Sequence, residues 1–155
     1  MTIFYGILSG VIVFVLGRFI EKIFIEPIKE HRMVIAEIYD GLIYHANKIS
    51  NPLEVTESIN EDTLKDYNQA SKELRRMSTK LRAATYNLKG MYKLYSILFN
   101  APKLEQISEV CGNLIGLSNR MTYKTRVSGR DIEDNYKKKE LIMKKLKLDK
   151  FDKKL

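Results

Sequence analysis

The part of this chain that most constrains its fold is its first twenty residues. Between Thr2 and Gly17 no side chain is charged, and most of them are Ile, Val, Leu or Phe. Counted on to Ile20, the segment approaches the roughly 20 residues that a helix needs to cross about 30 Å of hydrocarbon. Arg18 lies near its end, where a long side chain can reach the headgroups. The sequence therefore predicts a single N-terminal transmembrane helix.

Two other interpretations of the same segment are weaker but stay open. A cleavable secretory signal usually starts with a basic region and ends at a small-residue cleavage site. This segment has only the α-amino group before it and no such site after it. A buried helix at the centre of a soluble oligomer is the second alternative, but such a helix seldom stays apolar on every side for this length.

The charges that flank the segment predict its orientation. No basic side chain precedes it, whereas Arg18, Lys22, Lys29 and Arg32 follow closely. Basic residues are enriched on the cytoplasmic side of membrane helices. We therefore expect a single-pass protein of the inner (plasma) membrane, with its N-terminus outside and its C-terminal part in the cytoplasm.

One face of this helix carries small residues. Gly6, Gly10 and Gly17 fall within a narrow sector at 100° per residue, and Val13 lies on the same face. Gly6 and Gly10 form a G-x-x-x-G pair, which lets two helix backbones approach closely. We expect this face to pack between copies in a homo-oligomer, although glycine is also simply frequent in membrane helices.

The remainder of the chain has the pattern of an all-α protein. Pro27 removes one backbone hydrogen bond and predicts a hinge, so residues 1–27 are taken as the transmembrane helix and its juxtamembrane extension. Residues 28–148 carry apolar residues at helical spacing and predict a cytoplasmic bundle of about four helices. Residues 149–155 form a basic tail that we expect to fray.

Local signals predict the helix boundaries. The first bundle helix is expected over residues 28–49, because Asn51 and Pro52 follow it. Ser58 and Glu61 form a candidate capping box for the next helix. Pro102 is placed to open a helix that continues to about Leu117. The last helix is expected to begin at a cap formed by Ser128 and Asp131 and to end near Leu148.

The long second helix of the bundle has the most regular pattern in the chain. Its apolar residues alternate steps of three and four, which is the heptad pattern of coiled-coil packing. Packing within one chain is the simpler explanation, and an intermolecular coiled coil is the alternative. The residues of this seam are Tyr67, Ala70, Leu74, Met77, Leu81, Ala84, Leu88, Met91, Tyr95 and Leu98.

The charge pattern predicts an anionic partner. The net charge is +8, and between Leu74 and Leu104 the chain has seven basic residues and no acidic one. Such a surface suits nucleic acid, a nucleotide or acidic lipid, and the alternative is an ordinary solvated helix face. The candidate anion-binding residues are Arg75, Arg76, Arg82, Lys89, Lys93, Arg120, Lys124 and Arg126.

The inventory of reactive residues predicts no enzyme, no metal site and no cofactor. His31 and His45 are the only histidines, and no phosphate-binding loop, dinucleotide fingerprint or nucleophile elbow occurs. His45 and the single Cys111 lie on apolar helix faces, so we expect both to be core residues.

Three functions stay open from the sequence. The first is an oligomeric membrane protein whose basic bundle binds or senses an anionic partner and which perturbs or permeates the membrane. In outline, a membrane helix joined to a sensing domain resembles small effectors of bacterial defence systems, a likeness of architecture without a shared motif. The second is a passive anchor that recruits a partner protein, and the third is a soluble helical nucleic-acid binder.

Overall fold

The computed structural model describes residues 2–56, 59–124 and 126–149. Helices make up 80% of the structure, which confirms the all-α class. The elements in chain order are α1 (Thr2–Ile20), the π-helical turn η1 (Glu21–Ile25), α2 (Glu26–Tyr44), α3 (Ala46–Ser50), β1 (Leu53–Glu54), α4 (Glu61–Asn87), α5 (Tyr92–Leu98), α6 (Leu104–Asn119), β2 (Thr122–Tyr123) and α7 (Gly129–Lys145).

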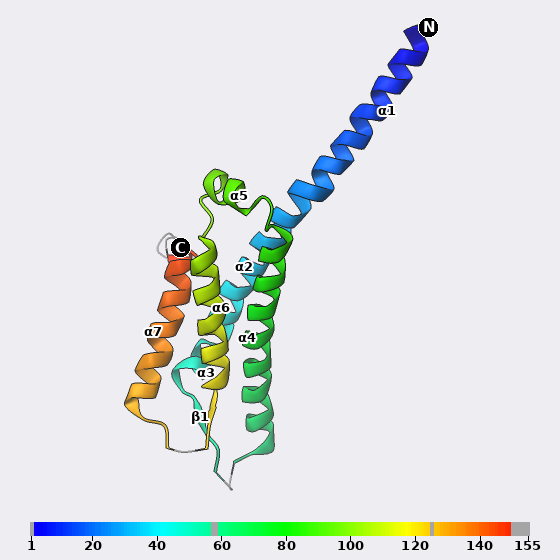
Figure 1. The fold of residues 1–155 in the computed structure, drawn as a ribbon. Coiled ribbons are helices and arrows are strands. Elements are labelled where there is room, and N and C mark those ends of the chain that lie inside the picture. The colour runs from blue at the N-terminus through cyan, green and yellow to red at the C-terminus, as the bar shows by residue number, and fades with distance from the viewer. Residues whose placement is uncertain (1, 57–58, 125, 150–155) are drawn as a thin grey trace.

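The bundle is formed by α2, α4, α6 and α7, which lie side by side in Figure 1. The long α4 contacts both α2 and α6, while α7 packs on α6 and is also touched by the short α3. Side chains from all four long helices are fully buried between them, and they include Ile38, Leu42, Leu74, Leu81, Leu114, Leu117 and Ile142. The predicted bundle of about four helices is therefore confirmed.

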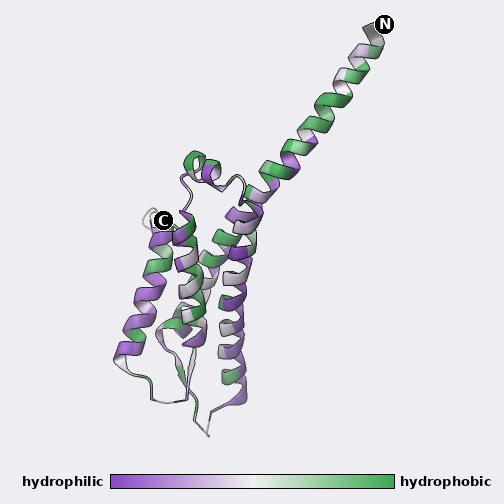
Figure 2. Cartoon of the chain, viewed as in Figure 1, coloured by the Kyte–Doolittle hydropathy of each residue, from purple (hydrophilic) through white to green (hydrophobic). Residues whose placement is uncertain are grey.

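Helix α1 projects away from this bundle into the open (Figure 1) and is apolar along most of its length (Figure 2). Among the residues with described side chains, which begin at Phe4 in α1, no helix is both long and apolar enough to span a membrane. The transmembrane prediction is therefore not confirmed.

The chain does not break at Pro27. It stays helical from α1 through η1 into α2, and Pro27 lies in the first turn of α2. The irregularity comes one turn earlier, in η1, where the N–H of Glu26 donates to the carbonyl oxygen of Glu21. Such a widened turn makes room for the proline ring and for the carbonyl left without its N–H donor.

The long heptad helix predicted through Leu98 is wrong at its C-terminal end. Helix α4 stops at Asn87, a turn follows, and α5 begins only at Tyr92. The helix ends because Leu88 and Lys89 donate to carbonyls three residues back, and Gly90 then lowers the helical propensity further. Leu88 is fully buried, whereas Leu98 is 66% exposed, so the seam does not continue onto α5.

The predicted helix ends agree with the structure in part. The capping box of Ser128 and Asp131 is confirmed, because each side chain accepts a backbone N–H of the other residue. Ser58 lies outside the described residues, and the cap of α4 is the Asn60 side chain, which accepts the N–H of Asp62 at 2.9 Å. The first bundle helix is interrupted at His45, which separates α2 from α3.

The connections also contain a feature that the sequence analysis does not predict. Two short strands pair in parallel, with Leu53 opposite Thr122 and Glu54 opposite Tyr123. This pairing ties the α3–α4 connection to the α6–α7 connection at the end of the bundle opposite to α1 (Figure 1). The basic tail from residue 150 onward lies outside the described residues.

Replacing two leucines of the predicted seam tests where α4 ends. We expect Leu88→Ala to lower the free energy of unfolding of the bundle by about 2–5 kcal/mol, because it empties a fully buried site. Leu98→Ala should change it by less than about 0.5 kcal/mol. Urea unfolding followed by circular dichroism in mild detergent measures both, and equal losses would instead support one continuous seam.

Candidate functional site

The most unusual surface of the protein is the exposed apolar helix α1. Val11, Ile12, Val13 and Phe14 are exposed by 53%, 49%, 69% and 65%, although successive residues point 100° apart around a helix. Exposure therefore surrounds the helix on all sides. An exposed apolar surface of this kind marks a site of interaction with lipid or protein.

The glycine face lies on this exposed helix. A Cβ added at Gly6, Gly10 or Gly17 would meet no atom within 4 Å, and Val13 stands on the same face. The face is thus open to a second helix. Its self-association stays a prediction.

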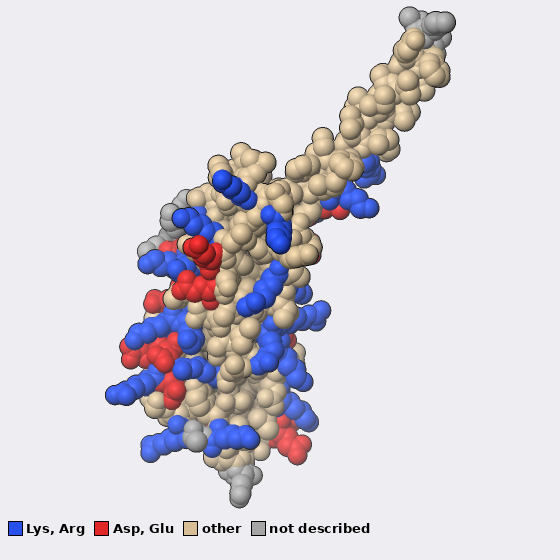
Figure 3. Space-filling model, in the orientation of Figure 1, with Lys and Arg blue, Asp and Glu red and all other residues tan. Residues whose placement is uncertain are grey.

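The predicted anion-binding residues do not converge on one surface. Arg75, Arg76 and Arg82 are on α4, Lys89 is in the turn after it, and Lys93 is on α5. Arg120, Lys124 and Arg126 lie around the α6–α7 connection, at the end of the bundle opposite to Lys89 and Lys93. Figure 3 shows basic side chains spread over the whole length of the bundle, with acidic side chains among them, most of these on the left.

Several of these cations have partners within the protein. Arg120 pairs with Asp134 at 3.1 Å, and Arg75 donates to the side-chain oxygen of Asn119 at 2.5 Å. Arg120 is thus largely neutralised by a carboxylate, whereas the Arg75 contact leaves its charge uncompensated. Among the other candidates, Arg82 and Lys89 share one groove near the end of α4.

Two of these candidate cations line a shallow groove of about 320 Å³ between α4 and α6. Arg82 and Lys89 line it together with Tyr86 and Ser108, and the Nζ atom of Lys89 lies 6.0 Å from the centre of the Tyr86 ring. Cys111 forms part of its floor, where burial raises the pKa of the thiol. Two cations beside an exposed aromatic ring suit a phosphate-bearing ligand.

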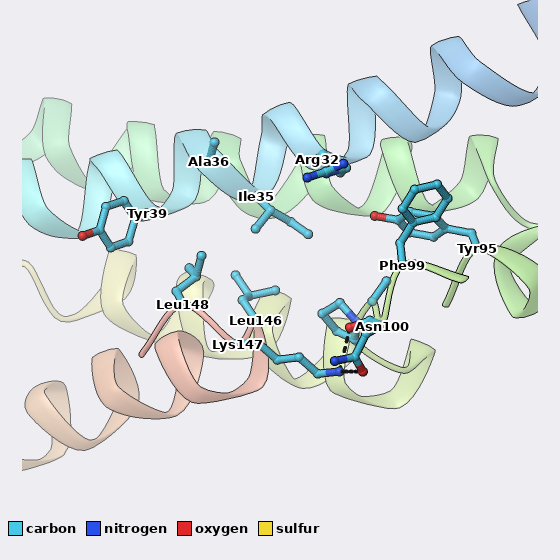
Figure 4. A pocket seen from close by; sticks show the side chains of 12 residues that line it. Arg32, Ile35, Ala36, Tyr39, Tyr95, Phe99, Asn100, Leu146, Lys147 and Leu148 are labelled. Carbon is cyan, nitrogen blue, oxygen red and sulfur yellow. Dashed lines mark hydrogen bonds between the residues drawn. The ribbon is translucent and has the colours of Figure 1, made fainter. Parts of the chain in front are cut away.

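A larger groove of about 580 Å³ lies between α2, the end of α5 and the end of α7 (Figure 4). Its walls are mostly apolar, from Ile35, Phe99 and Leu146 among others, and Arg32 stands at its edge. The Nζ atom of Lys147 donates to the backbone and side-chain oxygens of Asn100, at 2.7 and 2.6 Å. These bonds fix the chain after α5 to the end of α7.

A buried polar cluster holds α5 against the bundle. His31 on α2 is fully buried, with its Nδ1 atom 3.2 Å from the Tyr95 hydroxyl and its Nε2 atom 3.2 Å from the Thr85 hydroxyl. The single Thr85 hydroxyl proton goes to the carbonyl oxygen of Leu81 at 2.7 Å, so Thr85 accepts from His31 Nε2–H. Burial lowers the pKa of His31 to about 4 and so keeps the ring neutral near pH 7, which leaves Nδ1 without a proton and able to accept the hydroxyl proton of Tyr95.

The sequence does not predict this cluster, although the spacing of its tyrosines is a weak signal for it. Tyr92 and Tyr95 are spaced three apart, and both rings contact the His31 ring edge-to-face at 5.7 and 5.4 Å between centroids. The spacing marks one face of a helix. That the face meets a histidine 64 residues earlier in the sequence follows only from the tertiary fold.

The second histidine is also a core residue, as predicted. His45 is 3% exposed, and its Nε2 atom lies 2.6 Å from a Glu73 carboxylate oxygen. Hydrogen bonds from Gln69 and from His45 lower the pKa of Glu73. Within the described residues, no group of three or more His, Cys, Asp or Glu side chains is placed to hold a metal ion.

No protein-family model, curated protein or solved structure matches this chain.

His31 makes the stability of the bundle depend on pH. Burial lowers the pKa of His31 from 6.5 to about 4, so the folded state favours the neutral ring. The stabilisation is complete above pH 6.5 and is lost as the pH falls through 4, by about 3 kcal/mol in total. We expect the free energy of unfolding from urea titrations to fall over this window.

His31→Gln provides the control, because Gln donates and accepts hydrogen bonds but does not titrate. Its unfolding free energy should vary less between pH 6.5 and 4 than that of the unsubstituted chain. Parallel pH profiles for the two proteins would contradict the assignment of a neutral His31.

Proposed function

We propose that this protein is a non-enzymatic membrane protein in which α1 inserts into a lipid bilayer and tethers the bundle to its surface. The observation that carries the proposal is the exposure of large apolar side chains around the whole of α1. In water such a helix is unfavourable by about 25 cal/mol for each Å² of apolar surface, and hydrocarbon removes that cost. The polar backbone is no obstacle, because a helix satisfies its own hydrogen bonds.

The length and the charges of α1 support insertion. The 19 residues from Thr2 to Ile20 rise about 28 Å, close to the roughly 30 Å of a bilayer core. Their single charged side chain, Arg18, lies near the C-terminal end and pairs with Glu21 at 3.0 Å. Lys22 and Lys29 follow, so the positive-inside rule favours a cytoplasmic bundle and an N-terminus outside the inner membrane.

The glycine face supports an oligomeric form of this proposal. Gly6 and Gly10 are open to close approach by another helix, and Gly17 extends the same face. Two α1 helices packed through it would remain apolar toward lipid. Association of several copies is what a membrane-perturbing or pore-forming activity requires.

The basic groove between α4 and α6 supports an anionic partner for the bundle. Among the described residues, neither Arg82 nor Lys89 forms an ion pair with a carboxylate. Arg82 contacts the thiol of Cys111, and both cations line the same groove beside Tyr86. We propose that this groove binds phosphate groups, as found in acidic lipid, nucleotides or nucleic acid.

Charge placed in α1 tests the membrane insertion. Ile12→Arg with Leu16→Arg puts two cations on one side of the helix, each at a cost of about 2.5–3.5 kcal/mol near the bilayer centre. We expect the unsubstituted chain to stay in the membrane pellet after carbonate washing of cell membranes and this variant to be released.

The matched control is Ile132→Arg with Tyr136→Arg, which makes the same kind of change at the same spacing on exposed positions of α7. It should stay in the pellet. Release of the unsubstituted chain by carbonate would contradict the insertion of α1.

Charge reversal in the groove tests the anionic partner. Arg82→Glu with Lys89→Glu should weaken binding to a fluorescent single-stranded oligonucleotide or to phosphatidylglycerol vesicles by about tenfold or more. The difference in affinity between this variant and the unsubstituted chain should become smaller as salt is added, because the interaction is electrostatic.

Lys65→Glu with Lys72→Glu is the control, because it has the same charge change and the same seven-residue spacing on an earlier part of α4. Equal weakening by both variants would mean that only the net charge matters. If binding changes neither with salt nor with the groove substitutions, the anion-binding proposal is wrong.

A further inference from the structure

The short helix α5 exposes its apolar side chains instead of burying them. Its two tyrosines, Tyr92 and Tyr95, are 3% and 2% exposed. The aliphatic and aromatic side chains around them face outward, with exposures of 53% for Leu94, 68% for Ile97, 66% for Leu98 and 50% for the following Phe99. A helix that is free to turn in water would bury these four residues, so their exposure needs an explanation.

Polar contacts hold α5 in this orientation. The Tyr92 hydroxyl donates to the carbonyl oxygen of Pro102 at 2.7 Å, and the Tyr95 hydroxyl donates to the buried Nδ1 atom of His31. The two tyrosines thus point into the bundle and prevent α5 from rotating. The apolar side of α5 is consequently a fixed part of the surface and not a segment that awaits burial in the core.

The position of α5 in the fold indicates what this surface meets. Helix α5 lies at the end of the bundle from which α1 projects (Figure 1), and both are among the most hydrophobic parts of the chain (Figure 2). His31 links α5 to α2 within two turns of η1. A bilayer that contains α1 therefore lies next to this end of the bundle.

The charges around α5 suit an anionic surface. Lys93 is on α5 itself, Lys89 lies in the turn before it and Lys103 follows it, and all three are exposed. The carboxylate of Glu30 accepts a hydrogen bond from Asn87, and that of Glu109 pairs with Lys145. The bond from Asn87 leaves the charge of Glu30 in place, and Glu26 and Glu105 are exposed nearby. Arg32 and Lys147 line a groove with Tyr95 and Phe99, so with the three lysines five cations face these three carboxylates.

We propose that α5 is an interfacial helix that seats the bundle on an anionic bilayer. Leu94, Ile97, Leu98 and Phe99 enter the boundary between headgroups and acyl chains, and the flanking lysines contact lipid phosphates. This combination of apolar side chains and cations is what holds amphipathic segments at membrane surfaces. The inference rests on the proposed insertion of α1, to which it adds a second lipid contact.

The experiment uses the full chain reconstituted in lipid vesicles, with an environment-sensitive fluorophore attached to one introduced cysteine. The three sites are Leu98→Cys on α5, Ile12→Cys on the side of α1 away from the glycine face, and Asp62→Cys at the far end of α4. Labelling without denaturant leaves the buried Cys111 unreacted, which the unsubstituted chain checks. The vesicles contain phosphatidylcholine with or without phosphatidylglycerol, and lipids with a nitroxide near the headgroup or deep in the acyl chain act as quenchers.

We expect the label at residue 98 to be quenched several-fold more by the shallow nitroxide than the label at residue 62. The difference should be largest in vesicles that contain phosphatidylglycerol. Ile97→Glu with Phe99→Glu should abolish this quenching and leave the quenching at residue 12 by the deep nitroxide unchanged.

The other outcomes separate the two proposals. If residue 98 is quenched as weakly as residue 62 while residue 12 is quenched, the seating of α5 is wrong and the insertion of α1 stands. If the deep nitroxide does not quench residue 12, the insertion of α1 fails. A blue-shifted but unquenched label at residue 98 would show contact with a second copy in place of lipid and overturn the inference, as would equal quenching in both lipid mixtures.

Discussion

The structure depends on a bundle core that closes without α1. Leu42 on α2, Leu81 on α4 and Leu114 on α6 are fully buried by one another's helices and by α7, and Ile142 completes the core from that side. Protein interiors are packed at nearly crystalline density, so this core has no room for a further apolar helix. The apolar surface of α1 must be covered by something outside the chain. The membrane proposal follows from that constraint more than from hydrophobicity alone.

The continuity between α1 and α2 gives this constraint a mechanical consequence. Because the chain remains helical through η1 and Pro27, no flexible linker separates the exposed helix from the bundle. A helix connection transmits orientation, whereas a coil of the same length would not. Any medium that fixes the direction of α1 therefore limits which end of the bundle can touch it. That end carries α5, and it also carries the lysines at the end of the acid-free run.

The sequence predicted those features that depend on local spacing and missed those that depend on distant contacts. The all-α class, the bundle and the cap at Ser128 follow from periodicity and hydrogen-bonding chemistry within a few residues. The boundary at Asn87 was missed because Leu88, Met91, Tyr95 and Leu98 continue the heptad pattern although the backbone turns. A heptad pattern shows which residues are apolar, but it does not show whether they all belong to one continuous helix.

The candidate anion-binding site was also predictable from the sequence only in part. The basic character of α4 is visible in the sequence, but the partners of Arg75 and Arg120 come from other elements and reduce the set of cations available to a ligand. The strand pairing of Leu53 with Thr122 joins segments nearly seventy residues apart and has no local signal. The sequence therefore identified the kind of charge on the surface, and the fold determined its distribution.

The buried His31 explains how α5 keeps its orientation although its apolar side chains are exposed. A hydrogen bond between neutral partners contributes only about 1 kcal/mol, but leaving a buried polar group unpaired costs about 1–3 kcal/mol. Rotation of α5 would break the contact of Tyr95 with His31 and that of Tyr92 with Pro102 together, which leaves several buried groups unsatisfied. The free-energy cost of unpaired polar atoms thus keeps α5 in its orientation. The apolar side of α5 can then face outward at little risk of collapsing into the bundle, as a surface that contacts lipid requires.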